Sequence, residues 1–502
     1  MITGNIIGYE TLESQNHLSG VNPVTQSDLE GSFSIATQVE IDLALNKAVQ
    51  AFPEYRKWPG TKRADFLDLI AQYILEIGDE LVIRAMAETG LAEARIISER
   101  GRTTGQLKMF ANAVRQTAWE EPTVDLAQPD RQPLPKADIR KHLVPLGPVV
   151  VFTASNFPLA YSTAGGDVAS ALATGCPVIV KAHESHPGTN ALVAEAIQRA
   201  AKDSGAPDGV FSTLYGYGPE LGQALVRDPR VKAIGFTGSY GAGRAIMDAS
   251  AMRPEPIPVF AEMGSLNPVL ITKSVLENKA VMIGEQLGAS MTMGAGQFCT
   301  KPGLLMVEES DQFDQFYQAL EAKIRAVAPT PMLNARIHSN FMRSLSQLSP
   351  ELNLVDLNEG GSHLIKPAIA VVSGDEFIKH TQWHHEVFGP FAIIIKCNAA
   401  DQMVTILELL KGQLTTTIWS EPDDPGNDIL IDAMEQASGR IVWNGVPTGV
   451  EVCDSMMHGG PFPATSHPHF GAVGFSSLKR WTRPVAYQNF PQNWLPDSLR
   501  NK

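Results

Sequence analysis

The sequence predicts an α/β protein whose central β-sheet is parallel and is covered by helices on both faces. Between Gly147 and Glu262, short strand-like runs alternate with helix-like segments, which is the order typical of doubly wound sheets. The strand-like runs are apolar throughout, so both faces of each strand should be buried. The composition of the 502 residues, 44% hydrophobic and 19% charged, is that of a folded globular protein.

Amphipathic helices are predicted ahead of this region. From about Thr37 to Thr117, apolar residues recur at the i, i+3, i+4 and i+7 spacing of one helix face. The prolines between Glu120 and Lys136 then exclude a helix, and residues 137–145 have the pattern of extended chain. The strand-like runs that follow are GPVVVFT, PVIVK, VFSTL, VKAIGF and PIPVFAE, with helices predicted near Ala164–Thr174, Gly188–Ser204, Leu221 and Arg244.

A second α/β alternation follows Glu262. Its strand candidates are GLLMV, FAIIIKC, LTTTIWS and RIVWN, and the chain closes in a Gly/Pro-rich, extended tail after His458. The sequence shows neither an internal repeat nor a low-complexity tract.

Net charge and the positions of the cysteines argue against several classes of partner and of structural framework. The net charge of −14 argues against nucleic acids and anionic membranes as general partners. The four cysteines are far apart and form no CxxC pair, which argues against a disulfide framework and a cysteine zinc site. The first basic residue is Lys47, so no secretory or transit signal is expected, and no apolar run approaches the ~18 residues of a membrane span. We expect a cytoplasmic enzyme.

Three residues are candidates for covalent chemistry. Cys299 lies in a segment of small residues, where its thiol could be a nucleophile and its backbone N–H could face the group that the sulfur attacks. Glu262 ends a predicted strand, at the edge where open α/β sheets bind ligands, and could be a general base. Asn156 follows another strand and could donate to an oxyanion. Taken singly, each is also compatible with a structural role, as a buried thiol, a surface carboxylate or a turn former.

A dinucleotide site is suggested by two segments. Gly235–Gly243 places glycines, including Gly238, and Ser239 between a strand and a helix N-terminus, where free N–H groups attract a pyrophosphate. Lys181 and Glu184 follow the PVIVK strand and could bracket a ribose, although a solvated ion pair is the simpler interpretation. None of the 12 histidines has the H-E-x-x-H spacing, so we predict no metal centre.

In chain order, SNFP, PVIVK, FTGSYGAG, the strand ending at Glu262, GQFC and HEVFGP resemble the motifs of the aldehyde dehydrogenase superfamily. The resemblance covers nearly the whole chain. SMTMGAGQFCTKPG and NGVPTGVEVCDSMMHGGPFPATS are similar to the branch that holds α-ketoglutarate semialdehyde (2,5-dioxovalerate) dehydrogenases and a bacterial fatty-aldehyde dehydrogenase. Two features depart from the common pattern: Glu-Leu-Gly-Gly-Lys is here residues 262–266, EMGSL, and the tryptophan that often precedes the oxyanion asparagine is Ser155.

The resemblance implies a Rossmann-type cofactor domain, an α/β catalytic domain and a small β oligomerisation flap. We predict the cofactor domain from residues 1–129 and 146–261, the catalytic domain from 262–458, and the oligomerisation element and tail from 130–145 and 459–502. Strand edges of this kind are usually paired, so a homodimer or a dimer of dimers is expected.

The resemblance also implies NAD(P)-dependent oxidation of an aldehyde to a carboxylic acid. Cys299 would attack the aldehyde carbon, Asn156 and the Cys299 N–H would hold the oxyanion, and Glu262 would activate water to hydrolyse the thioester. A cysteine hydrolase that pairs Cys299 with a histidine, and a non-catalytic member of the fold, are the alternatives from other classes.

Cofactor and substrate residues follow from the same resemblance. Lys181 matches the adenine-ribose lysine, Gly238 and Ser239 the pyrophosphate contact, and Glu386 with Phe388 the nicotinamide-ribose site. Glu184 would repel a 2′-phosphate, so NAD is predicted over NADP, although NADP stays possible. The predicted substrate is 2,5-dioxovalerate, oxidised to α-ketoglutarate, and the alternative is an aliphatic or fatty aldehyde. Candidates for the substrate pocket are Arg102, Thr448 and Ser455 as anchors of a carboxylate and Phe157, Phe462, Met291 and Met293 as apolar lining.

Overall fold

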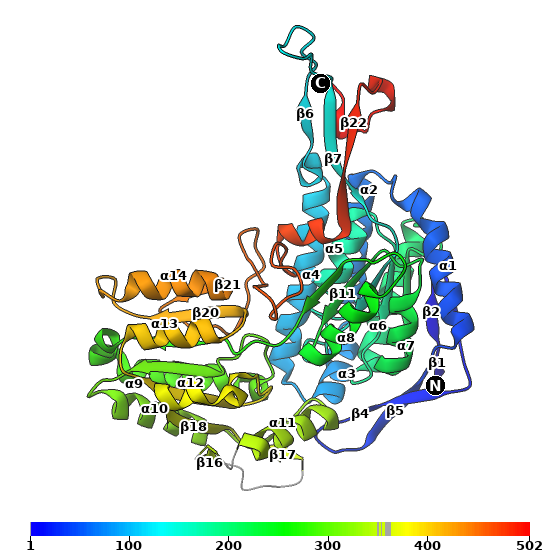
Figure 1. Cartoon of the computed structure of the whole chain (residues 1–502). Helices are drawn as coiled ribbons and strands as arrows, with labels where there is room; N and C mark the ends of the chain where they lie inside the picture. The colour runs from blue at the N-terminus through cyan, green and yellow to red at the C-terminus, as the bar shows by residue number, and fades with distance from the viewer. Residues whose placement is uncertain (1, 349–350, 353, 357–362, 502) are drawn as a thin grey trace.

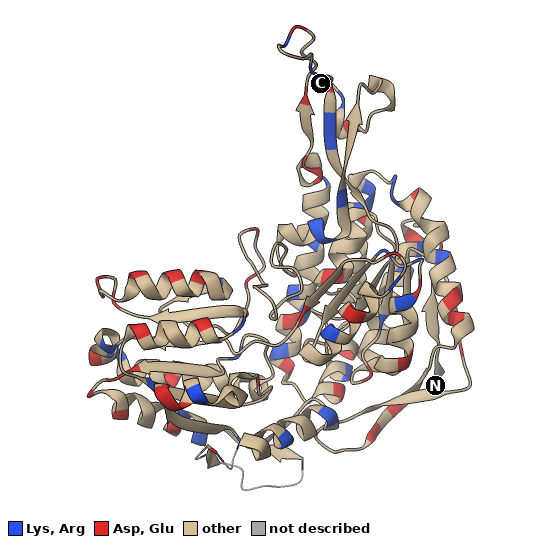
Figure 2. Ribbon diagram, in the orientation of Figure 1, with Lys and Arg blue, Asp and Glu red and all other residues tan. Residues whose placement is uncertain are grey.

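The computed structural model describes residues 2–348, 351–352, 354–356 and 363–501. Two α/β bodies lie side by side, and a narrow β-flap projects from the first of them (Figure 1). Acidic and basic side chains are interspersed over both bodies in the view of Figure 2. None of the described helices is both long and apolar enough to cross a membrane.

The first body is built on a seven-stranded sheet. Five parallel strands form its centre, and their residues are buried almost without exception, as the apolar runs predicted. Two short antiparallel strands from the N-terminus extend one edge, and these the sequence did not predict. In sheet order the strands are β12 (Val259–Glu262), β11 (Ala233–Thr237), β8 (Val149–Phe152), β9 (Val178–Lys181), β10 (Phe211–Leu214), β2 (Asn5–Ile7) and β3 (Glu10–Leu12).

Helices cover both faces of this sheet. Val149 and Val151 of β8 pack into one core, and Val150 and Phe152 pack into a second core on the opposite face. The predicted doubly wound arrangement is therefore confirmed. The helices are α1 (Gln38–Tyr55), α2 (Gly60–Glu76), α3 (Asp79–Thr89), α4 (Glu93–Val114), α5 (Gly166–Thr174), α6 (Pro187–Asp203), α7 (Gly218–Arg227) and α8 (Tyr240–Ala251).

The second body repeats the layered design. Its sheet is parallel except for one antiparallel edge strand, and helices again cover both faces. In sheet order the strands are β16 (Leu354–Asp356), β18 (Ala368–Ser373), β19 (Phe391–Cys397), β14 (Leu304–Glu308), β13 (Val269–Ile271), β20 (Gln413–Trp419) and β21 (Ser438–Trp443). The helices are α9 (Lys273–Thr292), α10 (Phe313–Arg325), α11 (Ala335–Leu348), α12 (Gly374–Lys379), α13 (Ala400–Leu409) and α14 (Asn427–Ala437).

The flap is a three-stranded antiparallel sheet. β7 (Ile139–Pro145) lies between β6 (Thr123–Asp125) and β22 (Thr482–Gln488). The pairing of β7 with β22 joins the two segments, 130–145 and 459–502, that were predicted to form one element. The sheet takes in residues 123–125, which the predicted boundary at residue 130 leaves to the cofactor domain. Residues before β22 pack instead on the first body, where Trp481 donates to Ser170 at 2.7 Å.

The smaller elements lie outside the two main sheets. β1 (Ile2–Thr3), β5 (Asp28–Ser34) and β4 (His17–Val21) form a separate three-stranded sheet, and β15 (Thr330–Pro331) pairs with β17 (Leu364–Ile365). Short 3-10 helices follow α4, α9 and α12 and recur in the tail, at Thr117–Glu120, Met293–Gly296, Thr381–His384, Phe475–Trp481, Gln492–Trp494 and Asp497–Leu499.

Two isoleucines on neighbouring helices test this packing. Ile74 on α2 is fully buried, whereas Ile83 on α3 is 65% exposed. We predict that Ile74→Ala lowers the free energy of unfolding by about 2–5 kcal/mol, because it removes buried methyl groups and leaves a cavity. Ile83→Ala, the matched control, should change it by less than about 0.5 kcal/mol. Denaturant unfolding followed by tryptophan fluorescence measures both, and equal midpoint shifts would contradict the burial assigned to α2.

Candidate active site

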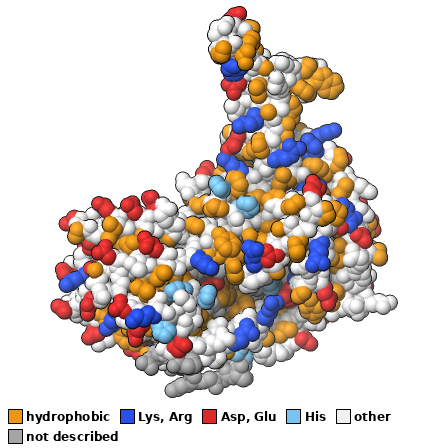
Figure 3. Space-filling model, in the orientation of Figure 1, with side chains coloured by type: hydrophobic (Ala, Val, Ile, Leu, Met, Phe, Trp, Pro, Cys, Tyr) orange, Lys and Arg blue, Asp and Glu red, His pale blue; other side chains and the backbone are white. Residues whose placement is uncertain are grey.

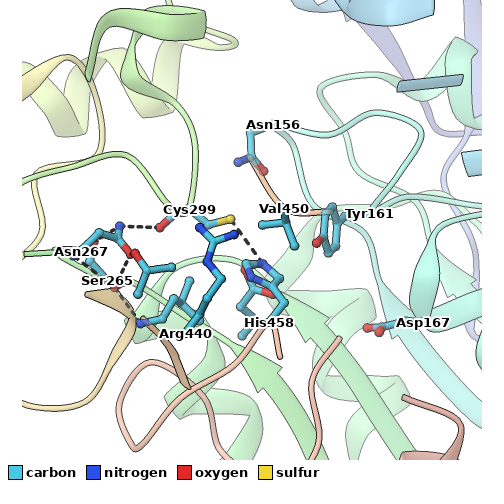
Figure 4. A network of polar contacts seen from close by, with 12 residues as sticks. Asn156, Tyr161, Asp167, Ser265, Asn267, Cys299, Arg440, Val450 and His458 are labelled. Atoms are coloured by element: carbon cyan, nitrogen blue, oxygen red, sulfur yellow. Dashed lines mark hydrogen bonds and ion pairs between the residues drawn. The ribbon is translucent and has the colours of Figure 1, made fainter. Parts of the chain in front are cut away.

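The three residues predicted for covalent chemistry meet where the two bodies face each other. Glu262 is the last residue of β12, Asn156 follows the carboxyl end of β8, and Cys299 lies in the segment between α9 and β14. The Asn156 side-chain amide donates to the carbonyl of Gln297 at 3.0 Å, two residues before Cys299. The carboxyl ends of two parallel strands and a loop of the second body thus bring these residues together; Figure 4 shows Asn156 and Cys299.

A fourth residue, His458, lies among them and was not singled out from the sequence. Its Nε2 is 3.6 Å from the Cys299 Sγ and 3.0 Å from the Glu262 Oε1. The His458 and Glu262 side chains are only 1% and 4% exposed. Ligand atoms of the three residues all lie within 4.8 Å of one another, a set able to hold a metal ion; the expectation of no metal therefore stays a prediction.

The environment of the Cys299 thiol opposes its ionisation. Burial raises the pKa of Cys299 well above its usual value, the Glu262 carboxylate raises it further, and the positive charge of Arg102 acts in the opposite direction. A thiol in such a place is protonated at neutral pH. It needs a nearby acceptor for its proton before it can act as a nucleophile, and His458 and Glu262 are both within reach.

The backbone around Cys299 is held by Asn267. Its side-chain amide donates to the carbonyls of Cys299 at 2.8 Å and Lys301 at 2.9 Å. Ahead of the cysteine, Gly296 has a φ of +65° and approaches another loop so closely that a Cβ would lie 2.4 Å from the Gly389 carbonyl carbon. The small residues that drew attention in the sequence therefore allow a tight backbone turn and a close approach of two loops.

The predicted dinucleotide residues lie at the carboxyl edge of the first sheet. Ser239 caps the 12-residue helix α8 and accepts from the Ala242 N–H at 3.4 Å. Lys181 ends β9, and its Nζ is 2.7 Å from the Glu184 Oε2. A helix N-terminus directly after a parallel strand, with Gly238 before it, fits a pyrophosphate, and the adjacent Lys–Glu pair fits ribose hydroxyls.

Glu386 approaches the site from the second body. Its Oε2 lies 2.4 Å from where a Cβ on Gly264 would be, so this carboxylate contacts the segment that follows Glu262. Burial raises the pKa of Glu386 to about 7, against the opposing effects of the Lys301 ammonium and the Ser265 N–H. The fully buried Lys301 donates to Phe391 O at 2.7 Å, which connects the loop carrying Glu386 and Phe388 to the loop of Cys299.

Comparisons with known proteins agree with this arrangement. A model described as the aldehyde dehydrogenase family matches residues 11–461. The chain belongs to the aldehyde dehydrogenase family. It is 46% identical to alpha-ketoglutaric semialdehyde dehydrogenase 2 of Azospirillum brasilense over 93% of this chain and 90% of that one. It is 42% identical to alpha-ketoglutaric semialdehyde dehydrogenase of Acinetobacter baylyi, with the same coverage of 93% and 90%.

Solved structures show the same fold at lower identity. A 1-pyrroline-5-carboxylate dehydrogenase from Thermus with bound NAD has a TM-score of 0.84 at 21% identity, covering 97% of this chain and 92% of that chain. An NADP-dependent glyceraldehyde-3-phosphate dehydrogenase from Bacillus halodurans complexed with NADP has a TM-score of 0.83 at 20% identity, covering 97% and 99%. The predicted aldehyde dehydrogenase fold is confirmed, and family members with either dinucleotide share it.

Two of the predicted substrate residues of this aldehyde dehydrogenase lie near Cys299, Glu262 and Asn156. The Phe157 ring contacts the rings of Tyr161 and Phe298, with centroids 5.2 and 5.4 Å away. Arg102 donates to the Tyr161 hydroxyl at 3.3 Å and to the Val450 carbonyl at 2.6 Å. Phe157 and Arg102 therefore contribute to one wall next to Cys299.

The remaining substrate candidates are placed elsewhere. Ser455 is exposed, and Phe462 is 43% exposed and pairs with Tyr240 at the start of α8, on the cofactor side. Met291 is fully buried in the core of the second body, and Met293 is 50% exposed. The hydroxyl of Thr448, the last candidate, lies 2.5 Å from that of Ser290. These observations do not link Ser455, Phe462 or the two methionines to Cys299, so their part in a substrate pocket stays a prediction.

Substitution of Glu262 should change thiol alkylation and aldehyde turnover in opposite directions, which tests the effect of its charge on Cys299. We predict that Glu262→Gln raises the rate of iodoacetamide alkylation of Cys299 severalfold at pH 8, since removing the carboxylate lowers the thiol pKa and increases the thiolate fraction. The same variant should lose about 10²–10⁴-fold in aldehyde turnover, because the general base is gone. Asp248→Asn, an exposed acid on α8, is the control. Slower alkylation in Glu262→Gln would contradict the assigned charge interaction.

Proposed function

We propose that the protein oxidises 2,5-dioxovalerate (α-ketoglutarate semialdehyde) to α-ketoglutarate with NAD as the electron acceptor. The observation that carries the proposal is that Cys299, Glu262 and Asn156 meet in one buried site. This site lies at the carboxyl edge of a parallel sheet, where a dinucleotide can bind. The two relatives above 40% identity, both named as dehydrogenases of this semialdehyde, support the choice of substrate.

The first half of the reaction is addition of the Cys299 sulfur to the aldehyde carbon. His458 Nε2, 3.6 Å from the sulfur, is placed to take the thiol proton. An amide nitrogen has two hydrogens, so Asn156 can keep its bond to Gln297 and still donate to the oxyanion that forms. A preorganised donor of this kind contributes about 3 kcal/mol to stabilising the transition state.

The second half is hydrolysis of the Cys299 thioester that remains after oxidation. When bound, an oxidised nicotinamide supplies the hydride acceptor. Glu262 Oε1 faces His458 Nε2 at 3.0 Å, whereas Oε2 has no hydrogen-bond partner within the described part of the chain, so Oε2 can accept from a water molecule. Glu262 takes a proton from that water while the water oxygen attacks the thioester carbon. The C–S bond then breaks and releases the acid and the thiol.

The preference for NAD rests on Glu184. Burial alone would raise the pKa of its carboxyl, but His183 and the Lys181 ammonium outweigh burial and hold the pKa low. An anionic Glu184 accepts from a ribose 2′-hydroxyl and repels a 2′-phosphate. The loop Gly216–Gly222, which leads into α7, carries no basic residue that could bind such a phosphate.

One observation favours a second candidate, a cysteine hydrolase. The 3.6 Å contact of Cys299 with His458 is the pairing such an enzyme needs. The helix-capping Ser239 and the Lys181–Glu184 pair have no role in that reaction, which favours the dehydrogenase. Dependence of turnover on oxidised nicotinamide separates the two.

Self-association is part of the proposal. Large hydrophobic side chains are exposed over the projecting flap and the tail beside it (Figure 3), among them Val124, Leu126, Leu134, Phe490 and Trp494. Apolar surface of this kind is typical of protein interfaces. A homodimer or dimer of dimers formed through the flap remains our prediction.

Initial rates of nicotinamide reduction test the proposed reaction. We expect wild-type protein to oxidise 2,5-dioxovalerate with a higher kcat/KM than hexanal. Cys299→Ala should abolish the reaction while cofactor binding persists, and Asn156→Ala should reduce kcat about 10²–10³-fold through loss of an oxyanion donor. Turnover by Cys299→Ala would refute the chemistry, whereas a preference for hexanal would refute only the substrate.

A single substitution tests the cofactor choice. Glu184→Gln removes the negative charge and keeps the shape of the side chain, so it should raise kcat/KM for NADP at least about tenfold. Its kcat/KM for NAD should fall by a smaller factor, since one hydrogen bond to the ribose is weakened. Rates with both cofactors at saturating aldehyde provide the measurement, with Glu277→Gln, an exposed residue on α9, as control. An unchanged NAD-to-NADP ratio would show that Glu184 does not select the cofactor.

A further inference from the structure

Two arginines from opposite bodies converge on one short segment beside Cys299. Arg102, on α4, donates through Nη1 to the Val450 carbonyl at 2.6 Å. Arg440, on β21, donates through Nη1 to the Gly449 carbonyl at 2.7 Å and through Nη2 to the Pro447 carbonyl. In segment 447–450, the consecutive carbonyls of Gly449 and Val450 therefore accept from two different guanidinium groups. This part of the segment lies close to Cys299.

We propose that Arg440, acting with Arg102, binds the carboxylate at the far end of the substrate and so selects aldehydes that carry an acid group. The inference rests on the proposed function and defines its substrate class as short aldehydes with a distal carboxylate, such as a 2-oxo acid semialdehyde. Arg102 was a candidate from the sequence, but Arg440 was not.

Neither guanidinium is neutralised within the described residues. No carboxylate forms an ion pair with Arg102 or Arg440, and the Nε of each is buried without a hydrogen-bond partner. Arg95, which stacks on the Phe157 and Phe298 rings of the same wall, is by contrast paired with the buried Glu99 at 3.3 Å. A partly buried cation without a counter-charge is unfavourable unless an anion binds to it. The charges of Arg102 and Arg440 can therefore be balanced by an anionic ligand.

Electrostatic interactions place both arginines near the reacting group. Burial lowers the pKa of the Arg440 guanidinium, while interactions with Cys299 and Tyr161 raise it; Arg102 in turn lowers the pKa of Cys299. Figure 4 shows Arg440, Tyr161 and Val450 around Cys299 and His458. The Tyr161 hydroxyl accepts from the Arg102 Nη2 at 3.3 Å.

The chemistry of the wall fits a small keto acid better than a long aliphatic chain. Phe157, Phe298 and Val473 pack together as an apolar cluster, against which the methylene groups of a short chain can lie. Guanidinium groups beyond them can bind a carboxylate with two parallel hydrogen bonds, which gives direction as well as affinity. A fatty aldehyde would leave both cations without a counter-charge.

Paired substrates of equal chain length isolate this role. We expect Arg440→Met to lower kcat/KM about 10- to 100-fold for 2,5-dioxovalerate, mainly through KM, because hydrogen bonds to a charged group are lost. The loss of kcat/KM for pentanal should be about tenfold smaller, because pentanal has no carboxylate for the guanidinium to bind. Arg440→Lys should keep part of the selectivity, since it retains the charge but loses the planar fork. Arg253→Met is the structural control, because Arg253 also bonds two backbone carbonyls but none of the segment 447–450.

Each outcome decides the inference. An equal loss of kcat/KM on both substrates in Arg440→Met would make the residue structural and overturn the proposal, as would a wild-type enzyme with no preference for dioxovalerate over pentanal. Oxidation of pentanal in that case would leave the dehydrogenase chemistry intact. Failure to oxidise either aldehyde with NAD would instead refute the proposed function itself.

A measurement on the wild-type protein covers the case in which Arg440→Met does not fold. α-Ketoglutarate should inhibit pentanal oxidation competitively with respect to the aldehyde, whereas its dimethyl ester, which lacks the negative charge, should inhibit at least about tenfold more weakly. Equal inhibition by the acid and the ester, or inhibition by neither, would overturn the proposed carboxylate site.

Discussion

The hydrogen bonds of Asn267 fix the geometry on which the rest of the site depends. Residues 263–268 connect β12 of the first sheet to β13 of the second, and Asn267 lies in this connection at a left-handed φ of +48° that asparagine tolerates. Its amide holds the Cys299 and Lys301 carbonyls, while its own N–H and that of Leu266 donate to the Gln413 Oε1. The segment that delivers Glu262 is therefore also the segment that positions the nucleophile.

Burial of the site determines the protonation of Cys299. Burial raises the pKa of Cys299, and the nearby Glu262 carboxylate raises it further. The arrangement keeps the thiol unreactive until its proton can leave to His458 or Glu262. Arg102 acts in the opposite direction and lowers the pKa of the thiol.

Local patterns predicted a large part of this structure. Apolar runs located the central strands, and the carboxyl ends of those strands located Glu262, Asn156 and Lys181, because parallel strands gather their ends at one edge. His458 and Arg440 had no such signal. His458 is 159 residues from Cys299 in sequence and belongs to an irregular tail, while Arg440 was part of an ordinary strand candidate. Contacts of that range depend on how two sheets dock, which neither periodicity nor spacing encodes. The pocket candidates Ser455 and Phe462 were taken from motif strings, and a string does not determine the direction of an exposed side chain.

Two residues that depart from the common family pattern, Ser265 and Leu266, lie in the same connection, and their contacts explain how they fit there. Ser265 accepts from the Leu414 N–H at 3.0 Å and lies 3.1 Å from the Gln413 Oε1, so its hydroxyl ties the connection to β20. Leu266 is buried in the core of the second body and has no charge to offer. The buried cation beside Glu386 comes instead from Lys301, two residues after the nucleophile, which donates to carbonyls of the loop that carries Glu386. Because burial lowers the pKa of Lys301 to about 8 and raises that of Glu386 to about 7, each group needs the other to stay charged. The position of Glu386, the predicted cofactor carboxylate, is thereby linked to the position of Cys299 through Lys301, two residues along the chain.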